Sequence, residues 1–127
     1  MEKTRDNYGL SIRGIDYDPK TVNQLRMFTK ESLEHWTTKS MVFHILRKMN
    51  HTVLSEFTIP GVGQGDILDL TTNVQYEIET VNNRNYHARR VEHYKRAGVD
   101  VVVIPTKGLP QDIKQRYKAI QVYIHPD

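Results

Sequence analysis

The spacing of hydrophobic and polar residues changes several times along the chain, and each spacing predicts a different element. Residues 28–50 contain no Gly or Pro and carry Met41, Ile45 and Met49 at intervals of four, which predicts an amphipathic helix. The same line runs back to Glu34, so this glutamate is expected to lie on the core-facing side of the helix.

Short runs rich in β-branched and apolar residues follow this helix and predict strands. They cover residues 51–59, 66–71, 74–80 and 99–105, with a short alternating segment at 121–125 expected at a sheet edge. Two further helices are expected at 82–97, ended by a cap at Gly98, and at 109–120. This order predicts an α/β fold, a sandwich with a mixed sheet and an α-β-β-β-α-β core, in which the helix at 82–97 joins two parallel strands.

Residues 1–27 precede the regular pattern and are expected to form an N-terminal extension, with a helix beginning at Asp18-Pro19. Residues 28–127 are expected to form a single domain, because 127 residues suffice for one hydrophobic core. Packing of the extension on its own core is favoured over contact with a partner.

Four acids stand in the two strands at 66–71 and 74–80, and three of them are expected to share one side. A two-residue turn at 72–73 would join these strands as a hairpin and place Asp66 opposite Glu79. Residues that face each other, or that lie two apart, share one side of a sheet. Asp66, Glu77 and Glu79 are therefore expected to converge, with Glu34 leaning over them from the helix. The other side of the hairpin is then formed by Ile67, Asp69, Tyr76 and Ile78.

Clustered carboxylates repel one another, by about 1 kcal/mol per pair in water and about 4 kcal/mol at a partly buried site. A hard divalent cation, Mg²⁺ or Mn²⁺, would compensate this repulsion, because such ions prefer carboxylate oxygens. The alternative is an acidic strand surface that faces solvent and binds nothing.

This layout resembles the PD-(D/E)XK nuclease superfamily, which has the restriction-endonuclease-like fold, and is most similar to its small archaeal Holliday-junction-resolvase-like members. The resemblance covers residues 30–105, about three fifths of the chain. In that family a helix glutamate, a strand aspartate and a following acid-x-lysine surround the metal. The matching residues here are Glu34, Asp66 and Glu77, with Glu79 in the place of the lysine.

Two residues depart from the family pattern: Gly65 stands where the family has proline, and Glu79 replaces lysine. In the family the lysine positions the attacking water and stabilises charge on the phosphorane, which a carboxylate cannot do. Arg84, expected on the inner line of the following helix, is the first candidate replacement, ahead of Lys39 and Lys95. Alternatively, the additional carboxylate would hold a second metal ion.

The resemblance implies a metal-dependent nuclease that hydrolyses phosphodiester bonds, with Mg²⁺ or Mn²⁺ as cofactor. Asp66 and Glu77 would bind the ion directly, while Glu34 and Glu79 would hold water or a second ion. DNA is the expected substrate, with RNA left open, and selectivity for branched structures in recombination or repair is a further expectation. The alternative function is a nucleic-acid-binding or assembly protein that has lost catalysis together with the lysine.

Composition agrees with a nucleic-acid partner, because the net charge is +3 and the pI about 9.2. The residues expected to contact nucleic acid are Arg84, Arg89, Arg90 and Lys95 in the basic helix and Gly63 in the glycine-rich connection before Asp66. The alternative for the basic residues is an ordinary solvated helix face.

The remaining features narrow the class of protein. The chain has no cysteine, no apolar run of membrane-spanning length and no signal-peptide pattern, so a cytoplasmic location without membrane attachment is expected. The six histidines lack zinc-binding spacing and are expected to lie on the surface or in packing positions. A homodimer is implied by the family, because two strands must be cut.

Overall fold

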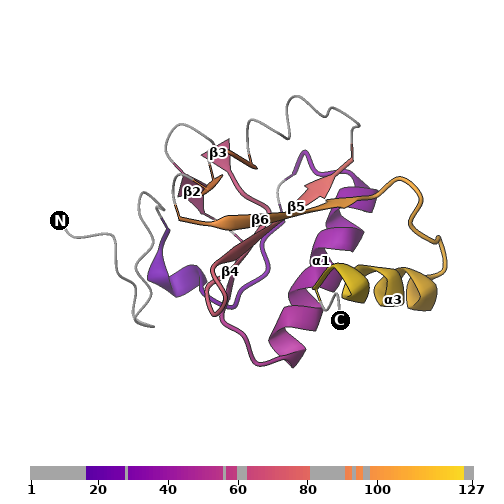
Figure 1. Cartoon of the computed structure of the whole chain (residues 1–127), viewed down its shortest axis with the longest axis horizontal. Helices are drawn as coiled ribbons and strands as arrows, with labels where there is room; N and C mark the ends of the chain where they lie inside the picture. Colours follow the sequence, from indigo (N-terminus) through magenta and orange to yellow (C-terminus); the bar gives the residue numbers. More distant parts are fainter. Residues whose placement is uncertain are drawn as a thin grey trace.

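The computed structural model describes residues 17–27, 29–55, 57–59, 63–80, 91–92, 94–95 and 98–124. Within them a four-stranded mixed sheet has the strand order β1-β4-β5-β6, and α1 and α3 pack against the sheet (Figure 1). The predicted α/β class and mixed sheet are therefore confirmed. The elements are η1 Pro19–Thr21, α1 Leu33–Lys48, β1 Val53–Leu54, β2 Thr58–Ile59, β3 Gly63–Gln64, β4 Ile67–Asp69, β5 Val74–Glu79, β6 Asp100–Pro105 and α3 Ile113–Ile124.

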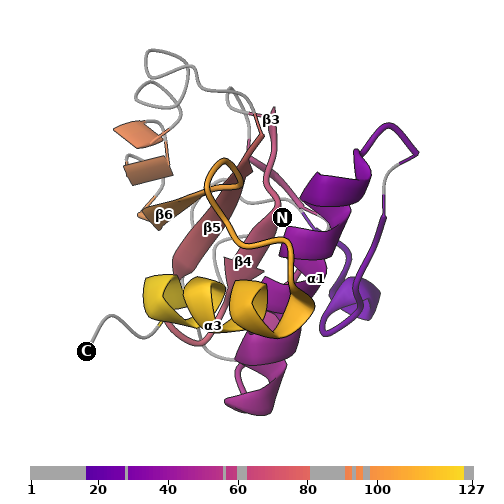
Figure 2. The ribbon, with the colours of Figure 1, turned by 90° about the vertical axis from the view of Figure 1, so that its right-hand side faces the viewer.

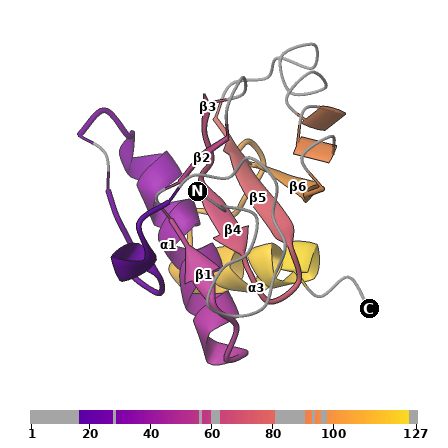
Figure 3. The same ribbon diagram turned by 90° about the vertical axis from the view of Figure 1, so that its left-hand side faces the viewer.

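Both helices cover the same face of the sheet. Helix α3 lies in front of the strands in Figure 2 and behind them in Figure 3, and it contacts both α1 and β6. None of the helices in the described segments has both the length and the apolar composition needed to cross a lipid bilayer.

Helix α1 begins five residues later than the sequence pattern predicts. Ser32 is its N-cap, with extended backbone angles and a side-chain oxygen that accepts a hydrogen bond from the His35 N–H at 3.1 Å. The predicted inner line is confirmed at Thr38, Met41 and Ile45, which are all buried. The line does not extend to Glu34, which is exposed in the first turn.

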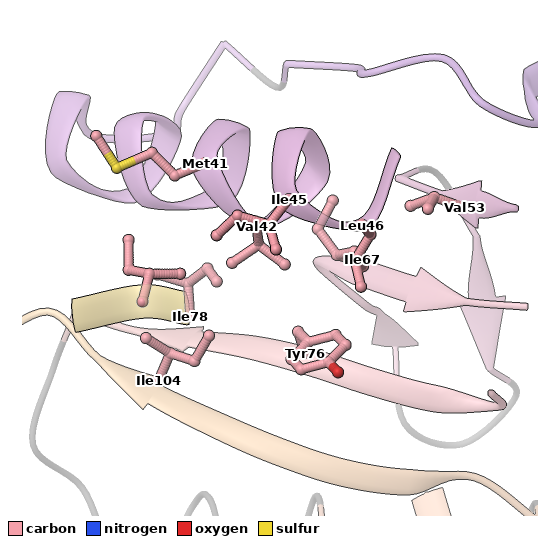
Figure 4. Packing of buried hydrophobic residues seen from close by; sticks show 10 residues of the cluster. Met41, Val42, Ile45, Leu46, Val53, Ile67, Tyr76, Ile78 and Ile104 are labelled. Atoms are coloured by element: carbon pink, nitrogen blue, oxygen red, sulfur yellow. The ribbon is translucent and has the colours of Figure 1, made fainter. Parts of the chain in front are cut away.

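The core between α1 and the sheet is formed by apolar residues from both layers (Figure 4). Val42 and Leu46 of the helix face Ile67, Tyr76 and Ile78 of the strands, and all five are buried. Each aliphatic side chain buried in this way contributes about 1.5–3 kcal/mol to stability. The prediction that Ile67, Tyr76 and Ile78 share one side of the hairpin is therefore confirmed. The side that packs on α1 is this apolar one, and not the acidic side over which Glu34 was expected to lean.

The register of the hairpin differs from the predicted one by two residues. Ile67 pairs with Tyr76 and Asp69 with Val74, so four residues connect the strands instead of two. Asn73 has a left-handed backbone (φ 62°) and donates its N–H to the Asp69 carbonyl at 2.7 Å. Because the difference is an even number, each side chain keeps its predicted side of the sheet, and Glu77 instead of Glu79 stands across from Asp66.

The pairing of β5 with β6 confirms the prediction of a parallel strand pair. Strands β5 and β6 are paired in parallel from Val74 with Asp100 to Glu79 with Pro105. Tyr94 and Lys95 are helical, and the turn after them is a Schellman motif in which Val99 N–H bonds the Tyr94 carbonyl at 2.9 Å. Gly98 occupies the left-handed position of this motif (φ 82°), as predicted for the cap.

The second face of the sheet carries its own buried cluster, and β6 lies at the edge of the described sheet. Tyr94 and Val99 are buried against Leu68 and Leu70 in this cluster. The nearly unbroken β-branched run at 99–105 predicts a buried strand, but four of the six β6 residues are only partly buried and Asp100 is exposed, so the predicted degree of burial is wrong.

Three other predicted elements need correction. The strand predicted at 51–59 is divided into β1, in the main sheet, and β2, which pairs with β3 in a separate two-stranded sheet. The edge strand predicted at 121–125 is wrong, because residues up to Ile124 continue α3. The helix begins at Ile113, after Asp112 accepts a hydrogen bond from the Gln115 N–H at 3.0 Å, and not at residue 109.

The described part of the N-terminal extension runs beside β1. Asn23 exchanges backbone and side-chain hydrogen bonds with Val53 at 2.7 and 2.9 Å. Tyr17 and Val22 pack against the second core cluster. The predicted helix from Asp18 is a single 3₁₀ turn, η1, and residues 1–16 lie outside the described residues.

Gly65 lies where no side chain can be accommodated. A Cβ at this position would come within 2.5 Å of the Phe57 ring, which is buried in the second core cluster. Gly65→Ala is therefore expected to lower the free energy of unfolding by about 1–3 kcal/mol through overpacking. Urea unfolding followed by circular dichroism measures the change in the free energy of unfolding.

The matched test is Gly65→Ala in a Phe57→Leu background, where the shorter side chain leaves room for the new methyl group. The destabilisation by Gly65→Ala is expected to shrink in that background. An equal loss in both backgrounds would contradict the steric explanation.

Candidate functional site

A pocket of about 380 Å³ lies where the start of α1 meets the start of β4. Its titratable side chains come from two distant segments of the chain: Glu31 and His35 at the start of the helix, and Asp66 just before the strand. The lining residues are Lys30, Glu31, Ser32, His35, Gly65, Asp66 and Thr80.

His35 bridges the two carboxylates of the pocket. Its Nδ1 lies 2.8 Å from Glu31 Oε1, and its Nε2 lies 3.1 Å from Asp66 Oδ1. The Ser32 cap fixes His35 in the first turn of α1, where it reaches Glu31 one turn back and Asp66 across the pocket. With a proton on both ring nitrogens, the imidazole donates to both carboxylates.

Asp66 is held in place by the neighbouring strand. Its Oδ2 accepts the backbone N–H of Ile78 at 2.8 Å. The fully buried Gln75 side chain adds a second clamp: oriented to satisfy both neighbours, its amide accepts the Asp66 N–H at 3.0 Å and donates to the Ile67 carbonyl at 2.7 Å. The side chains of Asp66 and Gln75 thus bond to backbone groups at the start of β4 and on β5. Asp66 Oδ1 faces His35.

Glu31 is held by a buried lysine that stands eight residues later, in α1. Lys39 is fully buried, and its ammonium group donates to Glu31 Oε1 at 3.1 Å and to the Arg26 carbonyl at 2.7 Å. The carboxylate of Glu31 is itself 7% exposed. A buried charge pair of this kind fixes the geometry of the turn that carries His35.

The environment of His35 changes its proton affinity. Burial by itself would lower the pKa of His35, but the hydrogen bonds and negative charges of Asp66 and Glu31 outweigh it and raise the pKa above 6.5. The protonated ring is therefore favoured in the folded protein.

This shift predicts a pH-dependent stability. Because the folded pKa of His35 is raised, its contribution to stability is complete below pH 6.5 and is lost as the pH rises through the folded value. Wild type is expected to lose more stability than His35→Gln between about pH 5.5 and pH 8.5, measured by urea unfolding in EDTA.

His44→Gln serves as the control, since His44 lies on the exposed side of the same helix and bonds Tyr117. Its pH profile is expected to follow that of wild type. Parallel profiles for wild type and His35→Gln would contradict the bridging role of the imidazolium.

The structure does not bring the four predicted acids together. Glu34 points away from the pocket, and its carboxylate lies 3.3 Å from the Arg116 guanidinium of α3. This corrects the prediction that Glu34 leans over the strands: the cap at Ser32 turns position 34 toward α3 and leaves position 35 facing Asp66.

The two acids of β5 lie beside the pocket and are not among the residues that line it. Glu77 is 6% exposed and lies on the strand next to Asp66. Glu79 is half-buried at the end of the strand, and its carbonyl accepts the N–H of Thr106 at 2.9 Å. Their predicted roles as metal ligands stay predictions.

The basic residues predicted to act on nucleic acid are mostly not located. Arg84, Arg89 and Arg90 lie outside the described residues, while Lys95 is exposed at the end of the helical segment. Gly63 lies in β3, paired with Ile59.

Sequence reasoning missed the charged and titratable side chains of the pocket other than Asp66, which are Lys30, Glu31 and His35. The available signal was Ser32, because serine is a preferred N-cap residue and a helix that begins after it places Glu31 and His35 one turn apart. Lys30 is the exposed cation among the residues that line the pocket.

The donors of this pocket suit a hard cation with few protein ligands. Among the residues that the structure describes, no three His, Asp or Glu side chains are arranged around one point. Mg²⁺, however, keeps several waters and is commonly held by one or two carboxylates together with substrate phosphates. Asp66, which directly precedes β4, and Glu77 of the paired strand β5 are the carboxylates that could hold such an ion.

Comparisons of the chain with protein-family models, with curated proteins and with solved structures gave no match.

Proposed function

We propose that this protein is a metal-dependent nuclease of the PD-(D/E)XK kind, with its active site at Asp66. The observation that carries the proposal is the meeting of Asp66, at the start of a strand, with Glu31 and His35 from the start of the preceding helix. Buried Glu77 stands on the adjacent strand, across from Asp66 in the extended register.

The order of elements supports the same fold family. The elements of the main sheet and its helices follow the order α-β-β-β-α-β, with α1, then β1, β4 and β5, then the helical residues before Gly98, then β6. The short pair β2–β3 is inserted between β1 and β4. The sheet combines an antiparallel hairpin with a parallel crossover pair, and a helix packs on it beside the acidic strand start. We infer a restriction-endonuclease-like core from this sequence of elements.

The chemistry follows from the charges around the pocket. A bound Mg²⁺ or Mn²⁺ would supply positive charge to the scissile phosphate and lower the pKa of the attacking water. Asp66 and Glu77 would hold it, and the Ile78 N–H keeps the Asp66 carboxylate oriented. His35 would keep a proton between Glu31 and Asp66, and Lys30 at the rim of the pocket would attract the phosphate backbone.

Glu31, which directly precedes the Ser32 cap of α1, takes the place that the sequence pattern gave to Glu34. It lies in the pocket with Asp66, whereas Glu34 pairs with Arg116. We therefore propose Glu31 as the helix acid of this site.

A second function is favoured by Glu79, which stands where the nuclease family has lysine. A protein that has lost this cation would bind nucleic acid without cutting it. Binding and cleavage must therefore be measured separately.

The test is incubation of the full chain with labelled single-stranded, duplex, flap and four-way-junction DNA and with RNA, in Mg²⁺, in Mn²⁺ and in EDTA. Cleavage in metal that stops in EDTA is expected. Gel-shift binding without cleavage in either metal would select the binding protein, and neither binding nor cleavage of any substrate would rule out both functions.

A further inference from the structure

A second pocket, of about 410 Å³, lies between the first turn of α1 and the start of α3. It shares no lining residue with the pocket at Asp66. Its volume lies within the range of small-molecule sites, about 300–1,000 Å³. The lining residues are Leu33, Glu34, Thr37, Gln111, Ile113 and Arg116. We call this set the α1–α3 pocket.

A buried arginine supplies the positive charge of the α1–α3 pocket. Arg116 is only 4% exposed, and its guanidinium group donates to Thr38 Oγ1 at 2.9 Å and to the Pro110 carbonyl at 3.2 Å. Its Nε is buried and has no hydrogen-bond partner in the described part of the chain. Because a buried donor without a partner is unfavourable, a ligand atom that accepts from Nε would gain binding free energy.

The acid that faces Arg116 is held weakly. One oxygen of Glu34 contacts Arg116 Nη2 at 3.3 Å, whereas strong charge-assisted hydrogen bonds are about 2.7–2.9 Å long. The side chain of Glu34 is also 48% exposed, so it can swing into solvent. A carboxylate from outside could then bond both Nη2 and Nε, which lie on one edge of the guanidinium group. Glu34 thus occupies a carboxylate position that is open to exchange.

Two helix N-termini add positive potential at the same place. Leu33 and Ile113, the first residues of α1 and α3, both line the α1–α3 pocket. The caps Ser32 and Asp112 each accept an N–H from further along their helix. The N–H groups of Leu33 and Ile113 themselves make no hydrogen bond within the described residues. Both helix dipoles therefore favour an anion in this pocket.

The same two residues give the α1–α3 pocket an apolar edge. Leu33 is 79% exposed and Ile113 is 70% exposed. Single exposed apolar side chains are common, but here two of them border one pocket that also contains a buried cation. Apolar walls with a few polar groups are typical of sites for small organic molecules. The combination suits a ligand that has both an anionic group and an aliphatic part.

We propose that the α1–α3 pocket binds a small organic carboxylate that carries an aliphatic chain. The carboxylate of the ligand replaces that of Glu34 on Arg116, and the chain packs on Leu33 and Ile113. The proposal does not depend on nuclease activity, because the pocket is separate from the one at Asp66 and the test measures binding only.

The test is titration of the full chain with hexanoate, with hexanamide as its uncharged counterpart, followed by the backbone amide signals in NMR spectra. Wild type is expected to bind hexanoate with a Kd of about 1 mM or tighter, with saturable shifts at Leu33 and Ile113. Hexanamide is expected to bind at least about 10-fold more weakly, because it lacks the charge that strengthens the hydrogen bonds to Arg116.

Three variants test the exchange of carboxylates. Glu34→Gln removes the competing charge and is expected to bind hexanoate about 3-fold more tightly than wild type. Asp100→Asn is the control, because it removes an exposed negative charge of β6 outside the pocket and is expected to bind like wild type. Arg116→Lys keeps the charge but not the paired donors, and is expected to weaken binding about 10-fold. Circular dichroism checks each fold, and half-exposed Glu34 keeps the test valid if Arg116→Lys does not fold.

Four results would overturn the proposal. Wild-type signals at the α1–α3 pocket that do not shift up to about 20 mM hexanoate would exclude the site. Equal binding of hexanamide would exclude recognition of the anion, and equal binding of inorganic phosphate would exclude selection for the aliphatic chain. Equal hexanoate affinities of Glu34→Gln and Asp100→Asn would show that Glu34 and the ligand do not compete for Arg116.

Discussion

Asp66→Asn is expected to lower the rate of metal-dependent cleavage by roughly 1,000-fold or more while the fold is kept. The substitution removes the charge that would hold the cation but keeps the shape of the side chain. The rate is measured in single turnover on whichever nucleic acid wild type cleaves, at saturating Mg²⁺.

The local hydrogen bonds allow this change. The amide oxygen of an asparagine can accept the Ile78 N–H, now bonded to Asp66 Oδ2 at 2.8 Å. Its NH₂ group can donate to His35 Nε2 once the ring is neutral, while Nδ1–H still donates to Glu31. The stability of the variant is therefore expected to stay close to that of wild type.

Asp112→Asn is the matched control, because Asp112 caps α3 outside the pocket and asparagine is an equally good N-cap. It is expected to cleave at the wild-type rate. Cleavage by Asp66→Asn at the wild-type rate would remove Asp66 from the site and with it the proposed function.

Lys39→Met is expected to destabilise the fold by about 3–5 kcal/mol. The substitution keeps the volume of the fully buried side chain but leaves the carboxylate of Glu31 buried without the ammonium group that bonds it at 3.1 Å. It also removes the donor to the Arg26 carbonyl. The loss is measured by urea unfolding at neutral pH.

Two further variants separate charge from packing. Lys48→Met changes an exposed lysine in the last turn of the same helix and is expected to alter stability by less than about 0.5 kcal/mol. Adding Glu31→Gln to Lys39→Met is expected to recover part of the loss, because no buried charge then remains uncompensated. A loss by Lys39→Met no larger than that of Lys48→Met would contradict the buried pair.

Repetitive patterns in the sequence predicted the core well. The spacing of four in α1 predicted buried Met41 and Ile45, and the alternation in the hairpin predicted that Ile67, Tyr76 and Ile78 share one side of the sheet. Both patterns depend only on local periodicity, which tertiary structure preserves as long as the register shifts by an even number of residues.

The errors occurred where a side-chain contact across the fold decides between two local patterns. Residues 121–125 alternate like a strand, but Tyr117, Ile120 and Ile124 also repeat at helical spacing and pack on the core beside α1. The tertiary contact selects the helix.

The site was predicted in part, for a related reason. Asp66 was found because it stands at the start of an apolar strand. Glu31 and Glu34 could not be distinguished by periodicity, since the choice depends on where the helix begins. Because α1 begins after the Ser32 cap, Glu31 contacts His35 in the pocket with Asp66, whereas Glu34 contacts Arg116. Residues 81–90 lie outside the described part, so Arg84 stays a prediction.

The four consecutive residues 32–35 at the start of α1 line two different pockets. Ser32 and His35 line the pocket at Asp66, whereas Leu33 and Glu34 line a pocket of about 410 Å³ toward α3. A ligand in either pocket that shifts this turn would change the binding free energy in both, and thermodynamic linkage makes the factor the same in each direction.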